Sequence, residues 1–479
     1  MGTRAITPPT EEEEAREANA PLAQSAVLSA APRPVSRFER RLKWLAPDMR
    51  VKRYLILIPL GIFFVLLGVA VFLYLNYIKY TDILYNLLLS TTGIRLEDPW
   101  VYRPLGIVFV GLGLWIILYA LIAVNRSIVS AVAPDSLSDL PDVIRRNRAL
   151  SQGAKIVVIG GGTGLSTLLR GLKTYTSNLT AVVAMSDDGG SSGQLKRQLP
   201  GGVLPPGDIR NCLVALADAE PIMQKLFQYR FQTVNDGDGL SGHNFGNLLI
   251  AAMADITGDF EEAVAQTAKV LAIRGRVLPS TVEPVSLVGT MADGATVHGE
   301  SAIAKDPRAI ERISLLPEHP HPVPEVLAAL LAADIIVMGP GSVFTSVVPN
   351  LLVPEIADAV QKSKASLKVY VCNVMTQRGE TDDYSASAHV KQVESHAGRR
   401  VFDYVMVNTT RPTDETLARY AVAGAQFVEP DLEAIQDLGY APVKGKYMSE
   451  TAVVRHDSEQ LAHDLLELFR QVAPGARFR

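Results

Sequence analysis

Cysteine is scarce in this sequence, whose 479 residues include only Cys212 and Cys372. Two cysteines exclude both a disulfide framework and a cysteine-rich zinc site. The eight histidines show no HxxxH-type spacing, so a zinc site is not expected from histidine either. The chain also lacks a positive excess, because its formal net charge is -4. A general nucleic-acid binder needs such an excess, and no nucleic-acid partner is therefore expected.

What the sequence does contain is two long apolar runs. Mean hydropathy is +0.17, which is high for a soluble protein and low for a polytopic transporter. Residues 55–75 and 105–124 carry no charged side chain. Each run is long enough to cross about 30 Å of hydrocarbon as a helix that rises about 1.5 Å per residue. We predict two transmembrane helices; the alternative is a buried helical hairpin in a soluble core.

Basic residues flank these runs unequally. Seven Lys and Arg residues but only two acids lie between positions 37 and 53, and four arginines lie between 126 and 148. The connection between the runs is balanced in charge. The positive-inside rule places both termini and the main domain in the cytoplasm and the connection outside, as in a multi-pass protein of the cell membrane. The first basic cluster could also lie on anionic lipid head groups.

The chain is predicted to have four parts. Residues 1–50 have the composition of a disordered tail. Residues 51–126 form the two-helix hairpin, and residues 127–152 form a polar linker. Residues 153–479 alternate apolar runs with helical patterns, which predicts an α/β, Rossmann-like domain with a mostly parallel sheet and helices on both faces. Within it, residues 276–313 resemble a small antiparallel excursion, either a lid or an interface.

A glycine-rich loop opens the globular domain. Residues 155–159 are a β-branched run typical of a buried parallel strand, and residues 165–173 have a helical pattern. Between them lie Gly160, Gly161, Gly162, Thr163 and Gly164. A glycine turn before a helix N-terminus can cradle a phosphate. The spacing is neither that of a Rossmann fingerprint nor that of a P-loop, and a tight turn alone is the alternative.

Two adjacent acids follow the next predicted strand, residues 180–185. Asp187 and Asp188 could hold a ribose, a Mg²⁺ ion or a substrate hydroxyl, and they are candidate catalytic residues. The alternative is a flexible Asp/Gly/Ser turn.

Two further polar segments precede predicted helices. Before residues 212–219, Asp208 can act as the helix N-cap, which is one alternative for this segment, while Arg210 and Asn211 could hold a phosphate or carboxylate. Before residues 248–256, His243 is a candidate general acid or base and Asn244 a candidate sugar or base contact. Capping is the alternative for the second segment.

The remaining candidates follow two more predicted strands. Residues 333–338 end in a second glycine turn with Gly341 and Ser342, another candidate phosphate or sugar contact. Residues 367–371 end in a polar segment that contains Asn373. Residues 402–407 are expected as a strand and residues 457–469 as a terminal amphipathic helix.

Six of these segments, in this order, resemble the 2-phospho-L-lactate transferase-like family, and within it the gluconeogenesis-factor branch. They are IGGGTGLSTLLRGL (159–172), SDDGGSSG (186–193), PGDIRNCL (206–213), HNFGNLL (243–249), GPGS (339–342) and NVMTQRGET (373–381). The resemblance covers roughly residues 155–470. It implies a Rossmann-like domain and a nucleotide-linked ligand. The two apolar runs depart from the usual soluble form of the family.

The resemblance also implies roles for matching residues. Gly161, Gly162, Thr163 and Gly164 would hold the ligand phosphates, and Asp187 and Asp188 would contact a metal or a polar substrate group. The site would be lined by His243, Asn244, Gly341, Ser342 and Asn373.

Three functions are compatible with these features. The gluconeogenesis-factor branch implies binding of UDP-N-acetylglucosamine and a role in cell shape and cell-wall precursor supply, without a settled catalytic activity. The transferase branch implies transfer of a phospholactyl group from a nucleotide donor, with Mg²⁺. NAD-dependent redox chemistry is the third. We favour the first, with a cell-wall precursor enzyme and a second copy of the chain as expected partners.

Overall fold

The computed structural model describes residues 52–73, 90–91, 99–132, 140–198, 204–218, 221–232, 240–450 and 453–474. These divide into two compact units, Met1–Asp142 and Val143–Arg479, which are described separately. The predicted disordered tail, residues 1–50, lies outside the described residues, as does most of the connection between the apolar runs.

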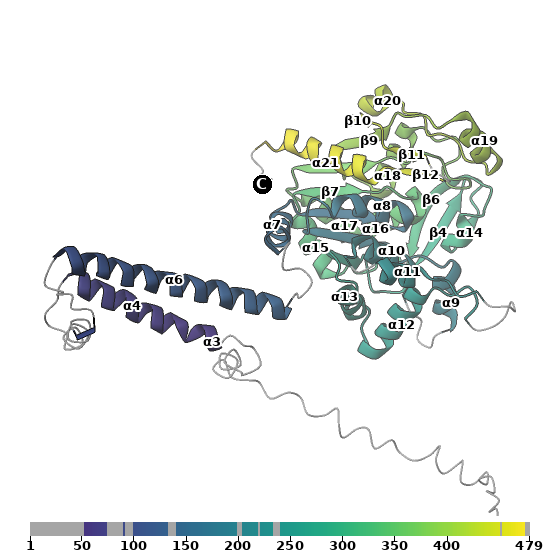
Figure 1. The fold of residues 1–479 in the computed structure, drawn as a ribbon. Helices are drawn as coiled ribbons and strands as arrows, with labels where there is room; N and C mark the ends of the chain where they lie inside the picture. Colours follow the sequence, from purple (N-terminus) through teal and green to yellow (C-terminus); the bar gives the residue numbers. More distant parts are fainter. Residues whose placement is uncertain are drawn as a thin grey trace, which may run out of the picture. The chain divides into compact units, whose positions relative to one another are not determined.

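The first unit contains a pair of packed helices. Its helices are α3 (Lys52–Leu55), α4 (Leu57–Phe72) and α6 (Pro99–Val132), and α4 lies along α6 (Figure 1). Glycines form the contact: a Cβ on Gly68 would lie 2.7 Å from the carbonyl oxygen of Gly106, and one on Gly61 would lie 2.9 Å from that of Gly113. The two pairs run in opposite chain directions, so the helices pack antiparallel with their backbones close together.

One helix of the described residues is long and apolar enough to cross a membrane, within Arg103–Val124 of α6. Helix α4 is apolar but has 16 residues, which at 1.5 Å per residue is about 24 Å, less than the hydrocarbon core. Large apolar side chains on both helices are exposed, among them Phe63, Leu66, Trp115 and Ile122.

The predicted linker is partly helical. Helix α6 continues to Val132, and α7 spans Leu140–Ser151. Arg145, Arg146 and Arg148 on α7 are exposed.

The second unit is built on a seven-stranded sheet in which every neighbouring pair is parallel. The strand order is β10-β9-β8-β7-β1-β2-β3. The strands are β1 (Ile156–Gly160), β2 (Leu179–Val183), β3 (Arg276–Pro279), β7 (Ile335–Met338), β8 (Leu367–Val371), β9 (Tyr404–Asn408) and β10 (Ala441–Gly445). The central strands are buried along their whole length, as apolar runs in a parallel sheet require.

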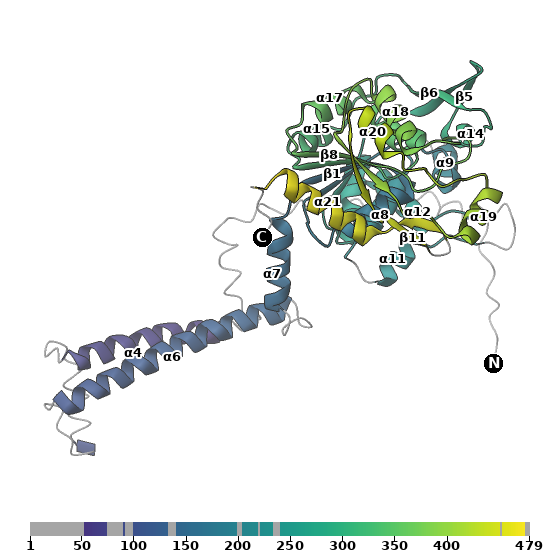
Figure 2. The ribbon, with the colours of Figure 1, turned by 90° about the horizontal axis from the view of Figure 1, so that it is seen from above.

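Helices cover both faces of this sheet. The helices after α7 are α8 (Gly162–Leu172), α9 (Gly190–Gln198), α10 (Gly207–Leu216), α11 (Pro221–Gln228), α12 (Phe245–Thr257), α13 (Phe260–Val270), α14 (Glu300–Ile303), α15 (Pro324–Leu331), the π-helix η3 (Val343–Val347), α16 (Val348–Leu351), α17 (Pro354–Lys362), α18 (Ala386–Ala397), α19 (Asp414–Val422), α20 (Leu432–Asp437) and α21 (Ser458–Val472). Figure 2 shows the sheet between α8 and α21 on one side and α15, α17 and α18 on the other. The predicted Rossmann-like α/β class is confirmed.

The predicted excursion is antiparallel only in part. Its first strand, β3, joins the edge of the parallel sheet, which corrects that part of the prediction. The separate antiparallel sheet has the order β5-β4-β6, from β4 (Ser286–Met291), β5 (Thr296–His298) and β6 (Ile310–Leu316). A second small sheet pairs β11 (Met448–Glu450) with β12 (Val454–His456).

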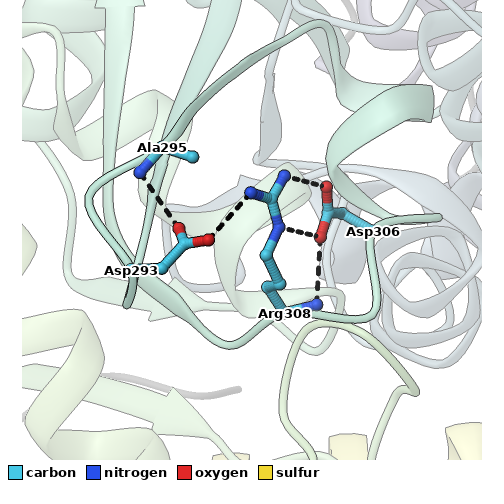
Figure 3. Close-up of polar contacts among 4 residues, drawn as sticks. All are labelled: Asp293, Ala295, Asp306 and Arg308. Atoms are coloured by element: carbon cyan, nitrogen blue, oxygen red, sulfur yellow. Dashed lines mark hydrogen bonds and ion pairs between the residues drawn. The ribbon is translucent and has the colours of Figure 1, made fainter.

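Arg308 links two turns of the excursion (Figure 3). Arg308 Nε and Nη2 donate to the two carboxylate oxygens of Asp306 at 2.8 and 2.6 Å, and Nη1 donates to Asp293 at 3.0 Å. Asp293 in turn accepts a hydrogen bond from the Ala295 amide. The guanidinium therefore joins the β4–β5 turn to the segment that enters β6. Because all three charged groups are at the surface, we assign this cluster a local ordering role.

Candidate functional site

A pocket lies where the strand order reverses. From β1 the chain adds β2 and β3 on one side and then returns to place β7 on the other side of β1. Open parallel sheets bind ligands outside the carboxyl ends of the strands at such a switch point. Both glycine loops, residues 160–164 after β1 and 339–342 after β7, leave the sheet here. We call the cavity between them the switch-point pocket.

The switch-point pocket has a volume of about 480 Å³. It brings together seven of the predicted site residues: Gly161, Gly162, Thr163, Gly164, Gly341, Ser342 and Asn373. Gly160, the last residue of β1, is not among the lining residues, and its carbonyl accepts a hydrogen bond from Asn350 Nδ2 at 3.1 Å. Asp187, Asp188, Arg210, Asn211, His243 and Asn244 do not line this pocket.

The glycine loop forms the N-terminus of α8. Gly162 has a φ of 65°, a conformation that favours glycine, and its amide donates to Asp208 Oδ2 at 2.6 Å. The capping alternative for Asp208 is wrong, because its carboxylate reaches across to α8 and Pro206 holds the cap position of α10. The amides of Thr163 and Gly164 lie in the first turn, where no intrahelical carbonyl is available. These two amides are the ones that α8 offers to an anion.

The two glycine loops pack directly against each other. A Cβ at Gly164 would lie 2.5 Å from the carbonyl oxygen of Pro340, so only glycine permits this approach. Asn373 holds the second loop with both ends of its amide: Oδ1 accepts from Gly341 N at 3.2 Å and Nδ2 donates to Gly341 O at 2.8 Å. Ser342 caps η3 and donates its hydroxyl to Glu380. Asn373 and Ser342 thus shape the pocket as well as line it.

The sequence interpretation missed the residues that strand β12 contributes to the pocket. Arg455 and His456 of this strand line the pocket together with the two glycine loops. Among the described residues that line it, Arg455 is the one with a permanent charge. Both residues lie in a three-residue strand close to the C-terminus, and nothing in the local pattern VVRHD distinguishes it from a surface turn.

The expected acidic pair belongs to a second group beside the pocket. We call Asp187, Asp188, Asp208 and Glu300 the acidic network. Asp187 accepts from Gly189 N and Asp188 accepts from Ser301 N, both at 2.8 Å. Burial, and then the neighbouring Asp187, raises the pKa of Asp208 to about 6. Burial, followed by Asp187 and Asp208, raises the pKa of Glu300 to about 9, so Glu300 is protonated at neutral pH.

The excursion supplies one member of this network. Glu300 begins α14, which follows β5, and Asp188 accepts from the amide of the next residue, Ser301. The carbonyls of Ala304 and Asp306, which follow α14, lie about 3.0 Å from where a Cβ on Gly379 would be. The excursion therefore lies against two of the loops whose residues were predicted to form the site.

The remaining candidates have protein partners. Arg210 donates to Asn247 Oδ1 at 2.9 Å and to Asn211 Oδ1 at 2.8 Å. His243 Nε2 lies 3.1 Å from Gln198 Oε1, and its Nδ1 lies 3.4 Å from Ser191 Oγ. Asn244 caps α12 by accepting from Asn247 N, which confirms the capping alternative for that residue.

The sequence allows Asp187 or Asp188 to hold a Mg²⁺ ion. Within the described ranges, no group of three or more His, Cys, Asp or Glu side chains is arranged to hold a metal ion. Asp187 and Asp188 each direct an oxygen to a backbone amide, and Glu300 is protonated at neutral pH. The residues present do not form a ligand set, and no step through a metal is assigned.

Comparison with known proteins identifies the family. The family model described as 2-phospho-L-lactate transferase CofD matches residues 156–448, which include both glycine loops and Asn373 but not β12. The chain belongs to the CofD family. The resemblance expected from the six segments is therefore confirmed.

Members of the CofD family at high identity include a protein named gluconeogenesis factor from Bacillus subtilis. It is 45% identical over 323 residues, which covers 67% of this chain and all of the relative. A relative from Nostoc sp. is 45% identical over 436 residues, 90% of this chain and 93% of the relative. That match is longer than the second unit, so it continues into the first. The crystal structure of a UPF0052-family protein from Bacillus halodurans has a TM-score of 0.63 at 45% identity, covering 66% of this chain and 99% of that one.

Proposed function

We propose that this chain is a membrane-anchored protein that binds a nucleotide sugar, UDP-N-acetylglucosamine or a close analogue, and regulates cell shape and cell-wall precursor metabolism. The observation that carries the proposal is the switch-point pocket, in which a helix N-terminus and Arg455 face one cavity. Because relatives of this chain are named gluconeogenesis factor, we favour a regulatory function over a transferase activity.

The electrostatics of the pocket support a diphosphate. The Thr163 and Gly164 amides offer two hydrogen-bond donors at the positive end of the α8 dipole. Arg455 adds a planar guanidinium, which binds phosphate oxygens in a bidentate manner. Asn373 and Ser342 are already bonded to Gly341 and Glu380, so they order the second loop around the ligand. The cavity volume is in the range of small-molecule sites.

The acidic network is expected to influence how strongly the pocket binds a diphosphate. Asp208 fixes Gly162, and its negative charge beside the phosphate site would oppose a bound diphosphate while Asp208 is ionised. The positive charge of Arg210, close to this network, offsets part of the negative charge of Asp208. We therefore expect these residues to tune the affinity of the pocket rather than to perform chemistry.

The membrane anchor rests on the first unit. Helix α6 is long enough to span, and the exposed side chains of α4 and α6 are mostly apolar. We propose that both apolar runs, residues 55–75 and 105–124, cross the membrane and that the chain's two ends lie in the cytoplasm. The exposed arginines of α7 would then lie at the cytoplasmic surface.

Calorimetric titration of the full chain in detergent tests the binding function. UDP-N-acetylglucosamine should bind, and Arg455→Met should weaken its binding by roughly 10- to 100-fold, because a charge-assisted hydrogen bond contributes about 1.5–3 kcal/mol. Arg170→Met is the matched control, since Arg170 is exposed at the opposite end of α8. Absence of binding by every uridine diphosphate sugar would remove the proposed function.

The second candidate is a transferase of a phospholactyl-type group, as the name of the family model suggests. It would use the acidic network, and Asp187 would be required for turnover. Turnover of a guanosine nucleotide-linked phospholactate donor, abolished by Asp187→Asn with the fold retained, would establish it in place of the regulatory function.

A further inference from the structure

His456 has a defined tautomer in the pocket wall. Its Nε2 lies 3.2 Å from the carbonyl oxygen of Cys372, which directly follows β8. A carbonyl oxygen can only accept a hydrogen bond, so Nε2 carries the hydrogen. Burial lowers the pKa of His456 to about 4, which keeps the ring neutral at physiological pH. In a neutral imidazole protonated on Nε2, Nδ1 has a lone pair and no hydrogen.

The ring is held in place from two directions. Strand β12 pairs with β11, where His456 faces Met448. The next residue, Asp457, caps α21 by accepting from the amides of Glu459 and Gln460. Helix α21 packs on α8, the helix that begins with the glycine loop, and Gly171 permits that contact. The imidazole is thus fixed relative to the amides of Thr163 and Gly164.

Within the described part of the chain, the ring of His456 makes one hydrogen bond, through Nε2, so Nδ1 has no protein partner. The pocket groups that would meet phosphates, namely the first-turn amides and Arg455, are all donors. Ionised phosphate oxygens can only accept, so they cannot pair with Nδ1. Among the groups of a bound ligand, only a hydroxyl or an N–H group can donate a hydrogen bond to Nδ1.

We propose that His456 is a specificity-determining residue, whose Nδ1 accepts a hydrogen bond from a hydroxyl or amide N–H of the bound nucleotide sugar. This inference rests on the proposed function and deepens it. The first-turn amides and Arg455 bind the diphosphate. His456 discriminates between ligands by the groups that are attached to the diphosphate. A ligand without a donor at that position leaves the acceptor unpaired and loses affinity.

Two amide substitutions separate the functions of the two ring nitrogens. His456→Gln places an N–H donor near the position of Nε2 and retains the bond to the Cys372 carbonyl, but it has no acceptor at the Nδ1 position. His456→Asn places an acceptor at the Nδ1 position and loses the anchor. Each full-length variant would be titrated with UDP-N-acetylglucosamine and with inorganic pyrophosphate, and its melting temperature compared with that of the wild type.

We expect His456→Gln to weaken UDP-N-acetylglucosamine by roughly tenfold or more and to leave pyrophosphate within about twofold. His456→Asn should retain more of the preference for the nucleotide sugar over pyrophosphate. Unchanged nucleotide-sugar affinity in His456→Gln, or equal losses for both ligands, would overturn the role of Nδ1. If His456→Gln is unfolded, ligand analogues replace it: the deoxy analogues and an analogue whose acetamido N–H is methylated. One of them should bind the wild type roughly tenfold more weakly, and equal binding of all would overturn the inference.

These outcomes are distinct from failure of the proposed function. A wild-type protein that binds no uridine diphosphate sugar contradicts the proposed function and the inference together. A wild type that binds, with His456→Gln unaffected, contradicts the inference alone.

Discussion

Asp208 is the residue at which the site differs most from a simple phosphate cradle. Its carboxylate accepts from the Gly162 amide at 2.6 Å and so satisfies one of the donors that would otherwise meet the ligand. Burial and the nearby Asp187 raise its pKa to about 6, compared with an ordinary value of 3.8. Between about pH 4 and 6 the folded protein therefore retains a proton on Asp208 that the unfolded chain has released.

This shift predicts a dependence of stability on pH. Because the folded state binds more protons between about pH 4 and 6, the free energy of unfolding falls as pH rises through that window. Asp208→Asn keeps an oxygen for the Gly162 amide and removes the charge. The variant should be more stable than the wild type at pH 8, by about 1–3 kcal/mol, and should match it near pH 3.5. Thermal unfolding across pH 3.5–8 measures this, and a difference that stays constant with pH would contradict it.

At the scale of elements, the sheet was largely predictable and the pocket only in part. Residues 367–371 form β8 with the predicted bounds, and β1 and β2 differ by one or two residues, because buried parallel strands are continuous apolar runs. Helix α10 begins at Gly207, five residues before the expected start, because its glycine and polar first turn lie outside the apolar pattern. The helix expected after Ser342 begins as a π-helix.

Site residues were predictable where they follow a strand in a glycine or polar loop. Gly161 to Gly164, Gly341, Ser342 and Asn373 meet in one pocket for that reason. Arg455 and His456 were not predictable as site residues. Strand β12, which carries them, is antiparallel and only three residues long, and it reaches the pocket through the packing of α21 on α8. The separation of Asp187 and His243 from the pocket depends on strand order, which a single sequence does not specify.

The α4–α6 contact allows a matched test of element packing. Gly68→Leu should separate the helices, because a Cβ there would lie 2.6 Å from the Val110 amide nitrogen. Gly111→Leu is the control, since a Cβ at Gly111 has no neighbour within 4 Å. Phe64 and Phe109, whose rings stack 6.1 Å apart, can be replaced by cysteines to report the contact by oxidative cross-linking. We expect the cross-link to be lost with Gly68→Leu and retained with Gly111→Leu; retention in both would exclude the glycine contact.

At the scale of the whole molecule, the chain combines a CofD-family domain with an apolar helical unit. The relative from Bacillus subtilis corresponds to the domain, whereas the match to the Nostoc relative continues into the first unit. The first unit is therefore not peculiar to this chain. The positive mean hydropathy is the average of an apolar hairpin and an ordinary α/β domain, and it describes neither.

Topology is the prediction that belongs to this scale. The full chain should sediment with membranes and resist extraction by high salt, whereas residues 140–479 alone should remain in the soluble fraction. A tag inserted between residues 79 and 98 should be labelled only from outside the cell. Labelling of that tag only after permeabilisation would contradict the proposed orientation, and a full chain released by salt would contradict the anchor.

The central claim is that the switch-point pocket holds a nucleotide sugar between the α8 N-terminus and Arg455. The most direct test is calorimetric titration of UDP-N-acetylglucosamine into the wild-type chain and into Arg455→Met and Arg170→Met. The account predicts saturable binding to one site per chain, lost or weakened at least tenfold in Arg455→Met and unchanged in Arg170→Met. Equal affinity in all three proteins would show that the ligand binds elsewhere.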